Sequence, residues 1–161
     1  IFRFFFSLCM CIAFTQPIRA NDDKEKLLEN LASELLPWVS KTTGYKTEGV
    51  RVTVILLEQR VINMLVYRER FLNQTDAKSA SVGNAVFLPT WFSPETDGYM
   101  LVHELVHVLQ SASDKKFPCE KEKEYEAYQV QDKYIIMTGI GEKTTFLFKA
   151  QYKCRPLHDD E

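Results

Sequence analysis

Two histidines four residues apart, with a glutamate directly after the first, are the residues whose types and spacing point to chemistry. They lie in His103-Glu104-Leu105-Val106-His107. Side chains at this spacing lie one above the other on a helix, so both imidazoles can reach one Zn²⁺ at about 2.0 to 2.1 Å. Glu104 is displaced round the helix, where it can accept a proton from a metal-bound water. The pattern therefore predicts two zinc ligands and a general base on one helix.

A third protein ligand is expected, because a catalytic zinc usually has three and leaves the fourth position to water. The metzincin continuation HExxHxxGxxH is excluded, since Gln110 stands at its glycine position and Ser113 at its third histidine. The remaining histidine, His158, belongs to the C-terminal tail, which we interpret as a frayed end. The third ligand is therefore expected to be a different type of residue.

Four glutamates between residues 120 and 126 compete for that role, in a predicted helix that reaches about Thr138. On a helical wheel the face of Glu124 also carries Ala127, Tyr128, Gln131 and Ile135. Glu120 lies near this face, whereas Glu126 points almost oppositely. We expect Glu124 as the metal ligand, with Glu120 second and Glu126 third. The alternative is that all four are solvated partners of neighbouring lysines, which is usual for a run of charge.

The element that carries the histidines is predicted to be an amphipathic helix. Ser93 can cap it, Pro94 suits its first turn, and the helix is expected to run through about Gln110. One arc of the helical wheel holds Leu101, Val102, Leu105, Val106, Val108, Leu109 and Ala112. The opposite arc holds His103, Glu104, His107, Gln110 and Ser111. We expect the apolar arc to face the core and the polar arc to hold the chemistry.

A helix is also predicted near the start of the chain, capped by Asp22 or Asp23 and running through about Val39. Its apolar face is formed by Leu27, Leu28, Leu31, Leu35 and Leu36. These leucines recur at the spacing of one helix face, which must be buried against another element. Gly44 is expected to end this region.

Strands are predicted between the two helices. Val50–Leu57 is rich in β-branched residues and indicates a buried strand. Val61–Tyr67 fits either a return strand or a short helix, and we favour the helix. Ala77–Val82 and Ala85–Leu88 flank Gly83-Asn84, a two-residue turn suited to a β-hairpin. The order of helix, strands, helix and helix predicts an α+β fold.

Residues 1–20 differ from the rest of the chain. They contain Arg3 and Arg19 but no acidic residue, with an apolar run from Phe4 to Phe14 and small Ala20 at the end. This is the layout of a secretory signal peptide, and the apolar run is shorter than the ~20 residues that span a bilayer. We expect cleavage after Ala20. Residues 21–161 would then be a single secreted or periplasmic domain without stable membrane insertion.

Composition sets limits on the remaining domain. The 161 residues carry a formal charge of -2 and are 45% hydrophobic, which excludes disorder and gives no reason to expect a nucleic-acid partner. Without Arg3 and Arg19 the balance is 18 basic against 22 acidic residues, a charge of -4. Cys119 and Cys154 remain, and an even pair commonly closes in an oxidising compartment, so we predict a disulfide. Two independent buried thiols are the alternative.

The chain resembles the gluzincins, metallopeptidases in which HExxH is followed by a helix whose ExxA or ExxS motif supplies a glutamate ligand. Glu124-Tyr125-Glu126-Ala127 matches that second motif. It resembles most closely small secreted bacterial domains of uncharacterised function that carry HELVHxLQ, a cysteine and ExEAYxxQ, here 103–110, Cys119 and 124–131. The resemblance covers about residues 77–138, and only its HExxH part is highly specific. It implies a minimal zincin-like fold, with a small mixed or antiparallel sheet packed on the site helix, and zinc peptidase activity.

Two roles stay open at the level of the sequence. Many gluzincins have an acidic residue four positions after the ligand glutamate that holds a ligand histidine, and here Tyr128 stands at that position. Tyr128, Gln131 and Asp132 are the candidates for this contact. The residue that stabilises the oxyanion is also undetermined. Its candidates are Tyr99, Tyr134, Tyr152 and Arg155.

The sequence therefore predicts a secreted zinc metallopeptidase. It would bind one Zn²⁺ through His103, His107 and Glu124, and use Glu104 as general base on a peptide or protein substrate. One arm of the 77–88 hairpin is expected to align this substrate by β-addition, and we expect a monomer. The alternatives are a zinc-binding module without catalysis and a metal-free secreted interaction domain whose polar helix face only resembles a site.

Overall fold

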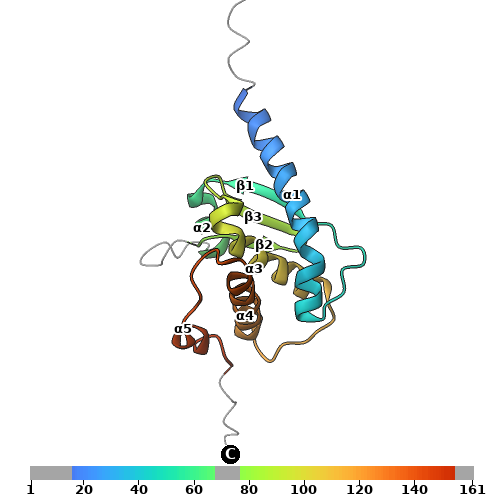
Figure 1. The fold of residues 1–161 in the computed structure, drawn as a ribbon, viewed down its shortest axis with the longest axis vertical. Helices are drawn as coiled ribbons and strands as arrows, with labels where there is room; N and C mark the ends of the chain where they lie inside the picture. Colours follow the sequence, from blue (N-terminus) through green and yellow to red (C-terminus); the bar gives the residue numbers. More distant parts are fainter. Residues whose placement is uncertain (1–15, 68–76, 155–161) are drawn as a thin grey trace, which may run out of the picture.

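Helices and one small sheet make up the computed structural model, which describes residues 16–67 and 77–154 (Figure 1). The elements follow the order α1 (Gln16–Thr43), β1 (Thr53–Leu57), α2 (Gln59–Tyr67), β2 (Ala80–Val82), β3 (Ala85–Pro89), α3 (Pro94–Ala112), α4 (Glu120–Thr138) and α5 (Phe146–Ala150). The predicted α+β fold is confirmed. So are the short helix after the first strand, now α2, and the helix expected to reach Thr138, now α4.

The sheet has the strand order β1-β3-β2 and is mixed. β1 runs parallel to β3, whereas β2 and β3 form the predicted antiparallel hairpin, in which Val82 pairs with Ala85. Gly83 in the turn has a φ of 57°, a left-handed conformation that glycine adopts without strain. The first strand is shorter than predicted, because only Thr53–Leu57 pairs with β3. β2 lies at one edge of the sheet.

The helix α1 is longer than predicted. It begins at Gln16, so Asp22 and Asp23 lie inside the helix instead of capping it. Its buried face includes Leu28, Ala32, Leu36 and Val39, all at most 7% exposed. Leu27 is 63% exposed, which corrects its assignment to the core face. Leu27 lies about 100° round the helix from Leu28, so burying the stripe of Leu28 and Ala32 turns it toward solvent.

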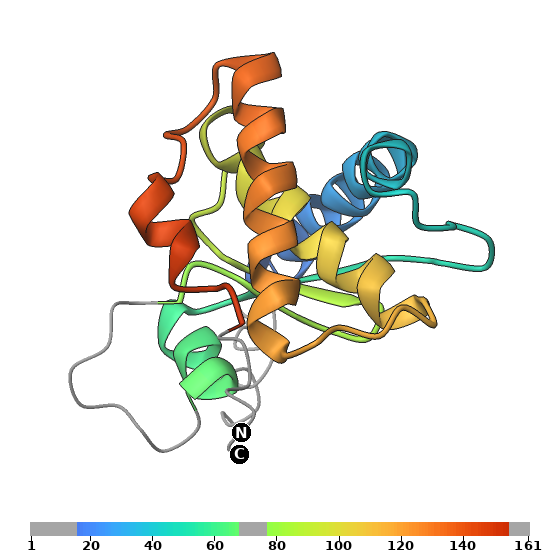
Figure 2. The same cartoon turned by 90° about the horizontal axis from the view of Figure 1, so that it is seen from below.

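The helix α3 occupies the centre of the core. It contacts α1 and the strands β2 and β3 as well as α4, which crosses it in Figure 2. Its apolar arc is buried as predicted from Leu101 to Leu109, with Leu101, Leu105 and Leu109 inaccessible to solvent. Ala112 is exposed, which corrects its assignment to this arc, because it is the last residue of the helix. The polar arc is largely covered too, since His103 is 8% and Glu104 4% exposed. The chemistry predicted from the sequence therefore lies between two packed helices.

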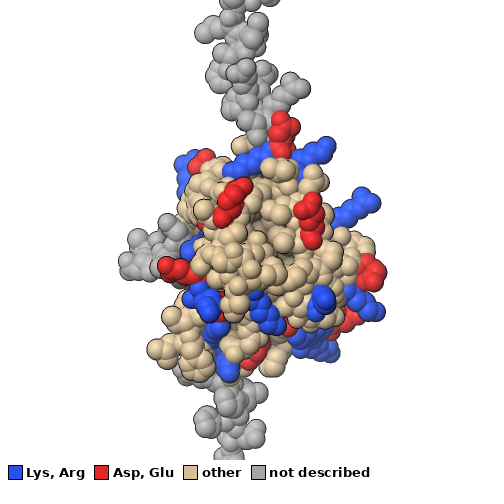
Figure 3. All heavy atoms as spheres, in the orientation of Figure 1, with Lys and Arg blue, Asp and Glu red and all other residues tan. Residues whose placement is uncertain are grey.

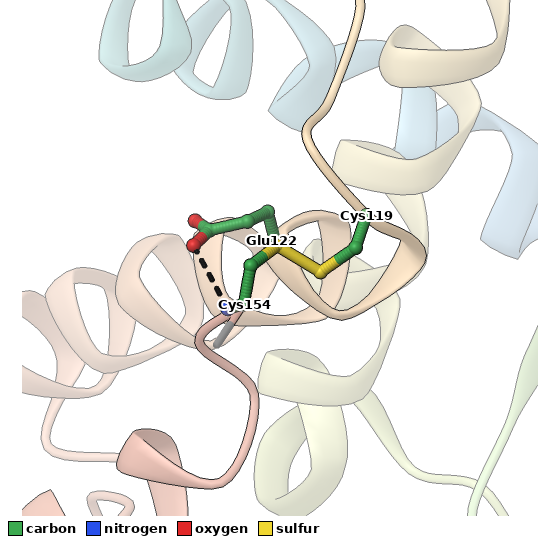
Figure 4. The surroundings of a disulfide bond; sticks show 3 residues. All are labelled: Cys119, Glu122 and Cys154. Carbon is green, nitrogen blue, oxygen red and sulfur yellow. Dashed lines mark hydrogen bonds between the residues drawn. A yellow bond between two sulfur atoms is a disulfide. The ribbon is translucent and has the colours of Figure 1, made fainter. Parts of the chain in front are cut away.

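The predicted disulfide between Cys119 and Cys154 is confirmed, with Cα atoms 6.0 Å apart (Figure 4). Cys119 is the N-cap of α4, and the bridge closes 35 residues of sequence separation. Glu122 Oε1 also accepts a hydrogen bond from the backbone N–H of Cys154 at 3.3 Å. Together these contacts fix the last described residues to the first turn of α4.

Lysine and arginine side chains are interspersed with acidic ones over the face in Figure 3, which agrees with the nearly balanced charge.

Within residues 16–67 and 77–154, no helix is both long and apolar enough to cross a membrane. Most of the predicted signal peptide lies outside the described residues, as do Arg155 and His158.

Candidate metal centre

Three predicted ligands meet between α3 and α4. His103, His107 and Glu124 each offer one ligand atom, and these atoms lie within 4.8 Å of one another. The Nε2 atoms of both histidines are 3.3 Å from a carboxylate oxygen of Glu124, His103 to Oε2 and His107 to Oε1. The two Nε2 atoms are 3.1 Å apart. The helical spacing and the helical-wheel choice of Glu124 thus bring together three atoms of the types that bind zinc.

The second- and third-choice glutamates do not contact these imidazoles. Glu120 has a side chain that is 86% exposed and pairs with Lys123 at 2.9 Å. Glu126 lies on another side of α4, where Lys115 Nζ donates to its Oε1 at 2.6 Å. The interpretation of the glutamates as solvated lysine partners therefore describes Glu120 but not Glu124.

Glu104 is adjacent to the cluster but is not one of the three converging residues. Its carboxylate accepts a hydrogen bond from Ser79 Oγ at 2.7 Å. Ser79 directly precedes β2, so this contact joins the edge of the sheet to the site helix. A buried carboxylate held by a hydroxyl next to two imidazoles is suited to receive a proton from a water molecule nearby. Sequence reasoning did not find the role of Ser79, because the contact joins residues 25 apart, one in the predicted hairpin arm Ala77–Val82 and one in the site helix.

Two glutamine side chains hold the imidazoles from the opposite side. Gln131 Oε1 is 3.1 Å from His103 Nδ1, and Gln110 Oε1 is 2.8 Å from His107 Nδ1. Both contacts leave Nε2 directed toward Glu124. Of the three candidates for holding His103 by a hydrogen bond, Gln131 makes it. Asp132 instead pairs with Lys149. The role of Gln110 was missed, although its i+3 spacing from His107 on a helix was a usable signal.

The electrostatics of the cluster favour a positive charge. Burial by itself would raise the pKa of Glu124, but hydrogen bonds with His103 and His107 hold it well below its usual value. Burial would lower the pKa of His107, yet its hydrogen bond to Glu124 and the charges of Glu104 and Glu124 raise it to about 9. Two carboxylates therefore stabilise a cation at this place, whether a proton or a metal ion.

Aromatic rings cover one side of the cluster. The ring of Tyr128 lies 4.6 Å from that of His103, and Tyr152 lies 5.2 Å from Tyr128. Burial raises the pKa of Tyr128, and Tyr152 and the charges of Glu124 and Glu104 raise it further. Tyr128 thus remains a neutral hydroxyl beside the site. Of the oxyanion candidates, Tyr152 contacts this aromatic group, whereas Tyr134 packs against Trp38.

The remaining oxyanion candidate among the described residues is also placed elsewhere. Tyr99 lies beside Lys78, whose Nζ is 5.7 Å from the centre of the tyrosine ring. Tyr99 is also close to Gly141, in the segment that follows α4. Tyr99 also packs against the hydrophobic core, so its contacts do not place it with His103, His107 and Glu124.

The fold and the cluster define a class of α+β domain in which two histidines and one glutamate converge between two helices. The chain belongs to the family described as Domain of unknown function (DUF6647), which matches residues 22–160. No curated protein and no solved structure matches the chain. The family description assigns no activity.

Proposed function

We propose that this chain is an exported zinc-dependent metallopeptidase of the gluzincin type. His103, His107 and Glu124 would bind one zinc ion, and Glu104 would act as general base. The observation that carries the proposal is the convergence of two Nε2 atoms and one carboxylate within 4.8 Å. Two imidazoles and a glutamate are the protein ligands of a common class of catalytic zinc sites.

The hydrogen bonds around the imidazoles support binding of a metal. Metal-binding histidines almost always donate their other ring N–H to an oxygen, which fixes the ring and its tautomer. Gln131 and Gln110 provide such oxygens to His103 and His107. The donor set therefore fits zinc not only in the type of its atoms but also in how the two rings are held.

Bound zinc would supply Lewis acidity toward a peptide carbonyl and a water molecule. Glu104 would accept the proton from this water and deliver it to the leaving amine. The hydrogen bond from Ser79 Oγ to Glu104 Oε1 would keep the carboxylate in position for both transfers. Tyr152, through its contact with Tyr128, is our choice for the residue that stabilises the oxyanion.

The edge of the sheet supports a peptide or protein substrate. β2 is an edge strand, and the chain directly before it contacts Glu104 through Ser79. An extended peptide that adds to this edge would form backbone hydrogen bonds with β2 and pass close to the proposed base. The substrate would be recognised mainly through its main chain, by a single copy of this protein.

Export is supported by the disulfide and by the pattern of residues 1–20. The Cys119–Cys154 bond is of the kind that persists in secreted and periplasmic proteins. The arginines, apolar run and small residue before position 21 have the order of a cleavable signal peptide. We therefore propose that the active form begins near Asn21.

The test combines zinc content with peptide cleavage. We expect one zinc per wild-type chain, with loss of zinc in His103→Ala and Glu124→Gln and retention in the control Glu120→Gln, whose side chain is exposed. Glu104→Gln is expected to keep zinc and to lower cleavage by about 10²- to 10⁴-fold, the range for a general acid or base. A Glu104→Gln variant with zinc and full activity would contradict the assigned base.

Two results with the wild type would contradict the proposal itself. Stoichiometric zinc without cleavage of a broad peptide library would indicate a non-catalytic zinc module. A careful purification and zinc titration that yield no binding would indicate a metal-free interaction domain. Cleavage by wild type but not by Glu104→Gln distinguishes the chain from a contaminating peptidase.

A further inference from the structure

The Glu126 carboxylate has three partners from three parts of the chain. Lys115 Nζ, in the loop between α3 and α4, donates to its Oε1 at 2.6 Å. The Tyr45 hydroxyl, in the segment after α1, donates to its Oε2. Gln110 Nε2, on α3, donates to the same oxygen at 2.9 Å. Only 20% of the Glu126 side chain is exposed, so this carboxylate is a fixed part of the packing between the elements.

One of the contacts to Glu126 comes from a charged group. Lys115 donates an ammonium N–H, and hydrogen bonds of this charge-assisted kind are roughly twice as strong as those between neutral groups. A carboxylate has no proton to donate, so toward the amide of Gln110 it can only accept.

The orientation of Gln110 follows from its acceptors. Its Nε2 donates to Glu126 Oε2 and to the backbone carbonyl of Lys123, at 2.9 and 3.0 Å. Neither acceptor can donate a proton, so the amide nitrogen must face them and Oε1 must face His107. An amide oxygen accepts from Nδ1–H of His107, at 2.8 Å. His107 therefore carries a proton on Nδ1, and its Nε2 is the nitrogen that faces Glu124, at 3.3 Å from Oε1.

We infer that Glu126 is a positioning residue for the zinc site, which acts on His107 through Gln110 and is itself held by Lys115 and Tyr45. This inference rests on the proposed function and deepens it. The glutamate that does not contact the imidazoles would still determine how one of them presents its nitrogen. We call this series of contacts, from Lys115 and Tyr45 through Glu126 and Gln110 to His107, the relay. It joins the segment after α1 and the α3–α4 loop to the proposed metal ligand.

The zinc affinities of two variants of α4 test the relay. Loss of a hydrogen-bonding partner behind a ligand typically lowers metal affinity by 10- to 100-fold. We expect Glu126→Gln to weaken zinc binding about 10-fold in competition with a chelator, by the same rule. Glu120→Gln is the matched control, because it removes an exposed carboxylate from the same helix and should change affinity less than about twofold.

A double-mutant cycle shows whether Glu126 acts through Gln110. In a Gln110→Ala background the side chain that connects Glu126 to His107 is already missing, so adding Glu126→Gln should cause no further loss of zinc affinity. A further 10-fold loss in that background would overturn the inference, since Glu126 would then act by another route. Tyr45→Phe, which removes one of the contacts that hold Glu126, should give a smaller loss than Glu126→Gln. Thermal unfolding of each variant checks that the protein is folded.

A measurement on the metal-free protein separates this inference from the proposed function. In NMR spectra of the wild type, the Nδ1–H proton of His107 should exchange slowly with water because Gln110 holds it. Exchange should become faster in Glu126→Gln and in Gln110→Ala, and stay unchanged in Glu120→Gln. Unchanged exchange in Glu126→Gln would overturn the relay even if the protein binds zinc. Absence of zinc binding in the wild type would instead contradict the proposed function. The exchange rates would still show whether Glu126 acts on His107 through Gln110.

Discussion

The helix α4 contributes carboxylates to two regions, and different groups balance the negative charge in each. Near its end, Asp132 is 7% exposed and pairs with Lys149, and it also accepts hydrogen bonds from the backbone and side chain of Thr144. Near its start, Glu124 faces His103 and His107. A lysine carries its charge at neutral pH whatever else is bound, whereas the proton of His107, whose pKa is raised to about 9, occupies a nitrogen that could bind a metal ion instead.

The difference separates a region with a structural role from the proposed metal site. A buried carboxylate is unfavourable unless it is paired and hydrogen-bonded. Asp132 meets this condition with groups of the chain itself, so its role is to hold the segment after α4 in place. The proton of His107 offsets only part of the negative charge of Glu124 and the nearby Glu104, and a divalent cation in its place would balance both carboxylates. The proposed zinc would thus complete one region, while the other is complete already.

Among the changes that test this difference between the two regions, removal of zinc should have the largest effect on the free energy of unfolding. At free zinc 1,000-fold above its dissociation constant, binding to the folded state alone stabilises a protein by about 4 kcal/mol. A chelator should therefore lower the free energy of unfolding of the wild type by about that amount, measured by urea titration with and without zinc. Glu124→Gln should show a much smaller gain with zinc. An equal gain in this variant would mean that zinc stabilises the fold elsewhere.

Asp132→Asn is expected to have the next largest effect, and only on stability. Removing one partner of a buried ion pair typically destabilises a protein by about 3 to 5 kcal/mol, because the other charge is left unpaired. Since Lys149 is 21% exposed and reaches water, we expect a loss near 3 kcal/mol in urea titration. Lys149→Met added to Asp132→Asn should recover most of it. A large loss of zinc affinity in Asp132→Asn would contradict the separation of the two regions.

The parts of the site that the sequence predicts follow from the periodicity of single helices. His103 and His107 meet because residues four apart share a helix face, and Glu124 is separated from Glu126 by the same geometry. Hydrophobic periodicity likewise predicts α3 and α4, and the Gly83-Asn84 turn predicts the hairpin. Each of these signals lies within a few residues along the chain.

The parts that the sequence does not predict depend on how elements pack. The contact of Tyr45 with Glu126 joins residues 81 apart, and that of Ser79 with Glu104 joins residues 25 apart. The burial of the polar arc of α3 depends on α4 crossing it, which no periodicity encodes. Leu27 was misplaced because several leucines in α1 compete for one buried stripe, and packing against α3 and β1 decides which face is covered.

Ser79→Ala is expected to have the smallest effect of the three changes, on the free energy of unfolding and on cleavage but not on zinc content. Ser79 Oγ donates to Glu104, and loss of a hydrogen bond to a buried charged group costs about 1.5 to 3 kcal/mol, less where water replaces the donor. We expect a loss of about 1.5 kcal/mol in urea titration and a decrease in cleavage rate of about 10-fold, with zinc content unchanged. Ser111→Ala, at an exposed position of the same helix as Glu104, is the control and should change neither quantity. If Ser79→Ala cleaved peptides at the wild-type rate, the hydroxyl would hold the sheet edge against α3 without positioning Glu104. The negative charge of the site would then be balanced by its cation alone.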